Sequence, residues 1–128
     1  MKVKELMRTS VAKVSPGTTV GEALSRMDVS GATSLPVEDA EGFLFGVARF
    51  ADLSRALAEG HVASSAAVGD GLSSHLVTAT PEMDVARVAE LMRDTGVDDI
   101  MVVEGRYLVG ALSLLEAGKA ETDLSPAL

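Results

Sequence analysis

The stretch that decides the fold reads Gly-Ala-Thr-Ser-Leu-Pro-Val at residues 31–37 and returns as Gly-Val-Asp-Asp-Ile-Met-Val at residues 96–102. The two stretches lie 65 positions apart, and both begin with glycine and end with valine. Outward from them, the same offset aligns Pro16 with Pro81. When the two halves are aligned at this offset, apolar residues and turn residues fall at matching positions more often than identical residues do. A fixed offset of this kind indicates a duplicated supersecondary unit.

Both repeats predict the same order of elements, which is strand, helix, strand, strand and helix. Apolar residues at i, i+3, i+4 and i+7 predict the first helix of each repeat, and a glycine follows each of these helices. Thr19 and Glu22 have capping-box spacing, and Asp84 is the N-cap candidate of the second repeat. The expected elements of the first repeat are strand 11–14, a helix from 20 to about 31, strands 34–37 and 43–48 and helix 51–59. Those of the second repeat are strand 76–79, a helix from 85 to about 96, strands 100–103 and 107–112 and helix 114–120.

We expect residues 1–60 to form the first repeat and residues 68–120 the second, joined by a Ser- and Ala-rich linker at 61–67. The tail, 121–128, contains a proline and no periodicity, so it is expected to fray. A repeat of about 60 residues buries too little surface to be stable alone. The predicted fold class is therefore α/β (α+β), with two β-α-β-β-α repeats packed sheet to sheet in pseudo-twofold symmetry. Ligand clefts are expected at the seam.

Composition excludes several classes of function. The 128 residues carry 11 Lys and Arg against 19 Asp and Glu, a net charge of -8, which repels nucleic-acid phosphates. The absence of cysteine excludes disulfides, thiolate zinc sites and cysteine nucleophiles. Apolar runs are far shorter than the roughly 20 residues of a membrane helix, and residues 1–5 lack the apolar core of a secretory signal. We expect a cytoplasmic protein that binds neither nucleic acid nor membrane.

The sequence contains no catalytic or metal-binding constellation, so we expect neither an enzyme nor a metal site. His61 and His75 have no second histidine or carboxylate at ligand spacing. No Ser-His-Asp order and no phosphate-cradling glycine loop is present. Methionines at core-facing positions are expected to fill the core: Met7, Met27, Met92 and Met101.

The ordered set of fragments, present twice, resembles a tandem pair of CBS (cystathionine β-synthase) domains, also called a Bateman module. The resemblance covers about residues 1–120. Members commonly bind AMP, ADP, ATP or S-adenosylmethionine in the seam clefts and control an attached enzyme, channel or transporter. The resemblance therefore implies a stand-alone regulatory module without a permanent cofactor, which forms a homodimeric disc of four CBS units and signals to an unknown partner protein. The fragments that carry it are 3–7, 14–16, 19–24, 31–37, 46–48 with Asp52 and Leu53, 85–92, 96–97, 100–103 and 110–113.

The family's ligand signature is Gly, two apolar residues, Ser or Thr, two further residues and Asp, at the start of a helix. The carboxylate accepts hydrogen bonds from the ribose hydroxyls, and the hydroxyl faces the phosphate together with helix N–H groups. The first signature, residues 46–52, keeps Asp52 but has Arg49 in place of the hydroxyl. The second signature, residues 110–116, keeps Ser113 but ends in glutamate.

In the first repeat, the resemblance assigns ligand contacts to Arg49 and Asp52. Arg49 is either a bidentate phosphate ligand or a solvated arginine paired with nearby acids. Asp52 is either a ribose ligand or an acid placed by the helix dipole in a first turn. The other candidates, with strand-edge polarity or a turn cap as the alternatives for their hydroxyls, are Ser15, Thr33, Ser34 and Pro36.

In the second repeat, Ser113 and Glu116 are either ligand residues or simply a capping box. Asp98 and Asp99 would repel a phosphate, and they either bind a ribose or a cation or form a solvated acidic turn. The other candidates of the second repeat are Ile100 and Thr80, and the alternative for the Thr80 hydroxyl is a turn cap before Pro81.

Two hypotheses of function follow. The leading one is a module that senses an adenosine-type metabolite (AMP, ADP, ATP or S-adenosylmethionine) at the cleft containing Asp52 and signals to a partner protein. The alternative is a ligand-free dimerisation and docking module with degenerate pockets, which the incomplete signatures favour. An enzyme would require a cluster of acid, base or nucleophile residues that the sequence does not show.

Overall fold

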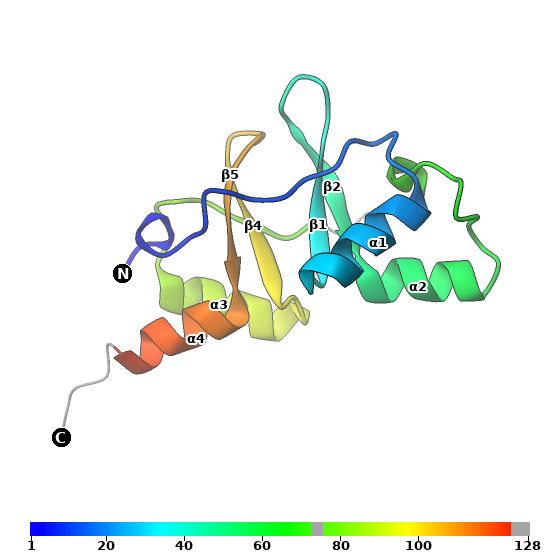
Figure 1. The fold of residues 1–128 in the computed structure, drawn as a ribbon. Coiled ribbons are helices and arrows are strands. Elements are labelled where there is room, and N and C mark those ends of the chain that lie inside the picture. Colours follow the sequence, from blue (N-terminus) through cyan, green and yellow to red (C-terminus); the bar gives the residue numbers. More distant parts are fainter. Residues whose placement is uncertain (73–75, 124–128) are drawn as a thin grey trace. The chain divides into compact units, whose positions relative to one another are not determined.

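The computed structural model describes residues 1–72 and 76–123 (Figure 1). The chain divides into two compact units, which are named here by their main segments. The 12–76 unit is Ala12–Leu76, and the 77–128 unit combines Val77–Leu128 with the lead-in Met1–Val11. The lead-in of the first sequence repeat therefore folds with the hairpin and helices of the second repeat.

The 12–76 unit contains an antiparallel hairpin, two α-helices and one 3₁₀ turn. Thr19 caps the first helix, because its Oγ1 accepts a hydrogen bond from the Glu22 backbone at 3.1 Å, and Gly31 ends that helix with a φ of 75°. Glu22 does not complete the predicted capping box, since its carboxylate pairs with Arg26 instead. The elements are α1 Val20–Ser30, β1 Ser34–Glu38, β2 Leu44–Arg49, α2 Phe50–Ala58 and η2 Val68–Gly71.

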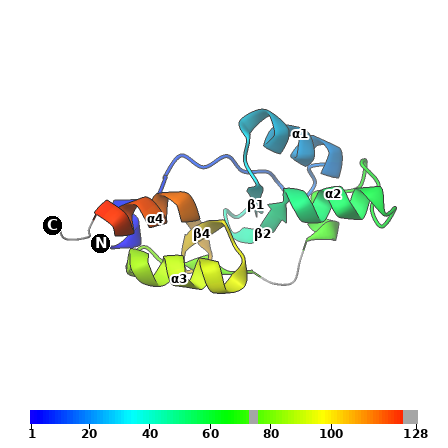
Figure 2. The same ribbon diagram turned by 90° about the horizontal axis from the view of Figure 1, so that it is seen from below.

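The 77–128 unit contains a three-stranded sheet in the order β3-β4-β5. Its helices α3 and α4 lie side by side (Figures 1 and 2). Asp84 occupies the N-cap of α3, but its side chain makes no capping hydrogen bond, so that part of the prediction is wrong. The elements are η1 Val3–Glu5, β3 Thr78–Ala79, α3 Val85–Thr95, β4 Asp99–Glu104, β5 Tyr107–Ser113 and α4 Leu114–Asp123.

The prediction of a strand at 11–14 is wrong. Only Val14 pairs, as a single parallel bridge to Val37, with its N–H donating to the Pro36 carbonyl at 3.0 Å. The residues before Ala12 cannot extend this pairing because they belong to the 77–128 unit. The hairpins and the helices were predicted correctly to within a few residues. Helix α4 runs on into the predicted tail, whose residues 124–128 lie outside the described part of the chain, as does His75.

Each unit has its own apolar core. The predicted core methionines are confirmed, because Met27, Met92 and Met101 are buried and Met7 packs against the core of the 77–128 unit. Along β1, Leu35 faces the core that also contains residues of α1 and α2. The alternation of the strand therefore leaves the intervening residues of β1 on the opposite face of the hairpin.

Candidate functional site

The face of the β1–β2 hairpin that is turned away from the core of the 12–76 unit carries two of the predicted ligand residues. In the register of β1 and β2, Ser34 is opposite Arg49 and Pro36 is opposite Val47. Directly opposed residues of an antiparallel pair project from the same side of the sheet. Leu35 occupies the helix-facing side, so Ser34 and Arg49 share the other one. Two of the predicted ligand residues are thus brought together by strand pairing alone.

Ser34 is buried without a hydrogen-bond partner. Its residue is 5% exposed, and its Oγ is the one buried side-chain polar atom without a partner among the residues that the structure describes. Buried polar atoms in folded proteins nearly always have a partner, and an orphan costs about 1–3 kcal/mol. The alternative of simple strand-edge polarity does not account for a hydroxyl that is withdrawn from water.

Arg49 is half-buried, and it is both the last residue of β2 and the N-cap residue of α2. Across residues 1–72 and 76–123 it forms no ion pair, so the interpretation as a surface arginine paired with nearby acids is wrong there. Asp52 lies in the first turn of α2, as predicted, and pairs with Arg55 at 3.2 Å. Arg49 supplies no side-chain cap to α2, and the Phe50 N–H donates to the Thr33 carbonyl at 2.9 Å.

Ser15, another candidate of the 12–76 unit, caps a turn. Ser15 is exposed, and its N–H donates to the Thr18 Oγ1 at 3.2 Å. Its own hydroxyl lies 3.2 Å from the same oxygen. This arrangement supports the turn-cap interpretation of Ser15. Pro36, a further candidate, is buried on the same hairpin face as Ser34, two residues further along β1.

In the 77–128 unit, an arginine from the lead-in holds the acids of the second signature. The Arg8 guanidinium donates to Asp99 at 3.1 and 3.4 Å and to the Glu116 Oε1 at 2.5 Å. Asp99 is opposite Ser113 in the β4–β5 register, which is the equivalent of the Ser34–Arg49 pair. The second site therefore has an internal cation where the first has an unpaired one.

Ser113 and Glu116 form a complete capping box at the start of α4. The Ser113 Oγ accepts from the Glu116 N–H at 3.0 Å, and the Glu116 Oε1 accepts from the Ser113 N–H at 3.2 Å. The predicted capping box is therefore present at this pair. Both side chains are engaged before any ligand arrives.

The interpretation of Asp99 as part of a solvated acidic turn is wrong. Asp99 begins β4, and its side chain is 16% exposed against 41% for Arg8. Asp98 is exposed, and its carbonyl accepts from the Leu114 N–H at 2.9 Å. Ile100 is fully buried in the core, so its side chain is a packing group.

Burial and charge set the protonation of this cluster. Burial raises the pKa of Asp99 and outweighs Arg8, which lowers it. Burial also acts to raise the pKa of Glu116, but hydrogen bonds from Ser113 and the charge of Arg8 lower it overall. The pKa of Arg8 is raised, because the two carboxylates outweigh the opposing effect of burial. Arg8 therefore contributes to the pKa shifts of both carboxyl groups, and both of them contribute to the pKa shift of Arg8.

Sequence reasoning missed Arg8. Its signal was a pair of acids in the second repeat that needed a cation, but only the folding of the lead-in onto β5 shows which cation it is. The Arg8 N–H donates to the Ala111 carbonyl at 2.8 Å, and the Ala111 N–H donates back to the Arg8 carbonyl at 2.9 Å. These two bonds fix the position of Arg8 beside the second signature. The backbone of Thr80, another predicted ligand residue, donates its N–H to the Met83 sulfur at 3.4 Å.

The signature glycines leave room for chain segments that pack onto the two hairpins. A Cβ at Gly110 would lie 2.7 Å from the Arg8 carbonyl oxygen and 2.7 Å from the Met7 sulfur. A Cβ at Gly46 would lie 2.6 Å from the Leu72 Cδ1. Packing against backbone therefore restricts the first signature position to glycine in the 77–128 unit, whereas at Gly46 the contact is with a side-chain end that can move.

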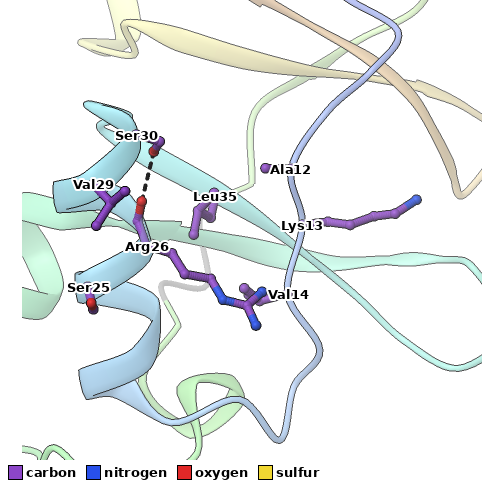
Figure 3. Close-up of a pocket in the computed structure, with 8 residues that line it drawn as sticks. All are labelled: Ala12, Lys13, Val14, Ser25, Arg26, Val29, Ser30 and Leu35. Carbon is purple, nitrogen blue, oxygen red and sulfur yellow. Dashed lines mark hydrogen bonds between the residues drawn. The ribbon is translucent and has the colours of Figure 1, made fainter.

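A groove of about 310 Å³ lies between α1 and the segment before it (Figure 3). Leu35 lines it from the helix-facing side of β1, so the groove is not on the Ser34 face. Its cations have partners, since Lys13 pairs with Glu38 at 3.2 Å and Arg26 with Glu22 at 2.8 Å. The groove contains none of the predicted ligand residues. Its lining is Ala12, Lys13, Val14, Ser25, Arg26, Val29, Ser30 and Leu35.

Ser34→Ala is expected to leave the free energy of unfolding unchanged or to raise it by up to about 1 kcal/mol, because it removes an orphan hydroxyl. Ser113→Ala removes a capping hydroxyl and is expected to lower it by about 1 kcal/mol. Urea unfolding of the two variants measures this difference in sign. A clear loss for Ser34→Ala would show that its hydroxyl already has a partner.

The described part of the chain holds no group of three or more His, Cys, Asp or Glu side chains placed to bind a metal ion. None of its helices has the length and apolar character needed to cross a membrane. His61 pairs with Glu59 at 3.3 Å.

The family model of the CBS domain matches this chain twice, at residues 3–59 and 68–117. The two matches include both signatures and both hairpins. The chain belongs to the CBS domain family, and its fold, with mixed helices and strands, is that of a CBS pair.

Among curated proteins, the chain is similar to the CBS domain-containing protein YhcV of Bacillus subtilis, with 32% identity over 88% of this chain and 79% of the relative. It is also 28% identical to a homoserine O-acetyltransferase of Methanohalophilus mahii, again over 88% of this chain but over only 23% of that enzyme. CBS pairs thus occur both in proteins of similar length and as part of larger enzymes.

Two solved CBS-pair structures have the same fold. One is the CBS domain pair of protein MJ0100 in complex with 5-methylthioadenosine and S-adenosyl-L-methionine, with a TM-score of 0.84, 20% identity and 98% coverage of both chains. The other is CBSX2 in complex with AMP, with a TM-score of 0.81, 23% identity and coverage of 96% of this chain and 97% of the other. At these identities the likeness establishes the fold alone.

Proposed function

We propose that this CBS pair is a regulatory module that binds an adenosine-type metabolite at the first signature, in the 12–76 unit, and signals its presence to a partner protein. The observation that carries the proposal is the buried, partnerless Ser34 hydroxyl opposite Arg49, which itself has no ion-pair partner in the described chain. Two polar groups left unsatisfied on one face are typical of a site that a ligand completes. The adenosine ligands of MJ0100 and CBSX2 supply the chemical class.

Asp52 is the third member of the proposed site. It keeps the aspartate of the signature and lies in the first turn of α2, three residues after Arg49. Its partner Arg55 is two-thirds exposed, so their ion pair is weak and a ribose hydroxyl can compete for the carboxylate. Homodimerisation and cytoplasmic location belong to this proposal as expectations.

The second signature is proposed to be structural. Its carboxylates are held by Arg8 and by the capping box, so a ligand would have to displace bonds that the chain already makes. This is also the observation that favours the alternative function, a docking module without a small ligand. Exposed apolar side chains at the starts of α2 and α4, Phe50 and Leu115, add to that alternative.

Isothermal titration with AMP, ADP, ATP, adenosine and S-adenosylmethionine tests the proposal, with the thermal midpoint as a second readout. A ligand at a hundredfold excess over its Kd stabilises the folded state by about 2.7 kcal/mol. Asp52→Asn is expected to weaken binding at least tenfold. The matched control is Glu116→Gln at the equivalent position of the second signature, which is expected to lower stability but leave the Kd unchanged.

Two results would overturn the proposal. The first is that none of the five compounds gives heat or shifts the thermal midpoint, and that natively purified protein releases no purine on denaturation. This result would favour the alternative function, a docking module without a small ligand. Loss of binding in Glu116→Gln but not in Asp52→Asn would move the site to the 77–128 unit.

A further inference from the structure

We propose that the ligand of the 12–76 unit is a phosphorylated adenosine compound and that Arg49 selects the phosphorylated form. This inference rests on the proposed function, because it assumes that an adenosine compound binds at the first signature. It adds the charge of the ligand and the residue that recognises it.

Arg49 is the arginine of this unit whose charge is not already matched. Arg26 pairs with Glu22 at 2.8 Å, and Arg55 pairs with Asp52 at 3.2 Å. Arg49 makes no such pair within the described residues although it is half-buried. A guanidinium without a counter-charge favours an anion, and its planar fork fits phosphate oxygens bidentately.

Ser34 supplies a second donor on the same face. The Ser34–Arg49 register places the two side chains next to each other, with Cβ atoms about 5 Å apart in a pair of this kind. The Ser34 hydroxyl is nine-tenths buried and has no hydrogen-bond partner among residues 1–72 and 76–123. An oxygen of the ligand would satisfy it. A hydroxyl and a guanidinium on the same face of the hairpin are both donors suited to an anionic oxygen group.

The equivalent position in the 77–128 unit carries the opposite charge. There Asp99 stands in the place of Ser34 and Ser113 in the place of Arg49. The carboxylates of Asp99 and Glu116 share a single cation, Arg8, so this cluster is negative overall and repels phosphate. The two sites thus differ in sign, and the first is the one suited to an anion.

The charges at the first site disfavour a cationic ligand. The acid available to it there is Asp52, which pairs with Arg55. The sulfonium of S-adenosylmethionine would meet Arg49, a like charge. The arrangement therefore favours AMP over both S-adenosylmethionine and unphosphorylated adenosine.

The test is titration calorimetry of the wild-type chain and two variants with AMP, adenosine and S-adenosylmethionine, at low and high ionic strength. Wild-type protein is expected to bind AMP at least about tenfold more tightly than adenosine, in line with one charge-assisted bidentate contact. Arg49→Gln is expected to remove this preference and to change the Kd for adenosine less than about threefold. High salt is expected to reduce the preference in the wild type only.

Arg26→Gln is the matched control, because it makes the same charge change in the same unit, on α1, and is expected to keep the preference for AMP. The inference alone fails if adenosine or S-adenosylmethionine binds as tightly as AMP, or if Arg49→Gln weakens AMP and adenosine equally. The proposed function fails instead if none of the three compounds binds to a folded wild-type protein.

Discussion

Gly110→Ala is expected to lower the free energy of unfolding by about 2–3 kcal/mol, the range of a forced overpacking. The added Cβ would lie 2.7 Å from the backbone oxygen of Arg8, and backbone cannot rotate out of the way as a side chain can. The two hydrogen bonds between Arg8 and Ala111 would lengthen, and the lead-in would be pushed off β5. Urea unfolding monitored by circular dichroism measures the loss at constant m-value.

Two other glycines serve as controls for this prediction. Gly46→Ala meets the Leu72 Cδ1, the end of a side chain that can change rotamer, so a smaller loss of about 1 kcal/mol is expected. Gly118→Ala lies in α4 and meets nothing within 4 Å, so a gain of up to about 1 kcal/mol is expected from helix propensity. A loss at Gly110 no greater than at Gly46 would show that the lead-in is not held against β5.

The elements of the fold could be predicted because their signals are local. Thr19 caps α1 through a bond to a residue three positions away, and Ser113 and Glu116 form their capping box at the same spacing. The turn of each hairpin was likewise visible as a glycine between two apolar strands. In the candidate site, the position of Arg49 at the end of β2 could be predicted from the signature. The signature spans only the end of one strand and the start of one helix, so its spacing along the chain is enough to place its residues.

What could not be predicted depends on contacts between distant parts of the chain. Val14 forms only a single bridge in place of the predicted strand, because the residues up to Val11 belong to the 77–128 unit. Arg8 reaches Asp99 and Glu116 across 91 and 108 positions of sequence. No local pattern reports such a pairing. The burial of Ser34 and the absence of an acid beside Arg49 are likewise properties of the folded surroundings.

Arg8→Gln is expected to lower the free energy of unfolding by about 2 kcal/mol at pH 7. This figure lies between the cost of breaking a buried ion pair and that of losing an exposed one, since Arg8 is 41% exposed and Asp99 16%. The variant leaves the half-buried Asp99 carboxylate without its cation. Lys4→Gln is the matched control, because it removes the same charge from an exposed pair with Glu82 and is expected to change stability little.

The dependence of this loss on pH separates charge from packing. The pKa of Asp99 is already raised in the folded state, and removing Arg8 raises it further, so the variant's penalty is full above that pKa and fades as the carboxyl takes up a proton. The pKa of Glu116 is lowered partly by Arg8, and that stabilisation is present at neutral pH and is lost as pH falls through the folded-state value. Both effects make the wild-type advantage shrink towards pH 4, and Asp99→Asn in the Arg8→Gln background should recover part of it at pH 7. A loss that is equal at both pH values would mean that Arg8 stabilises the 77–128 unit through its aliphatic stem and backbone bonds, and not through its charge.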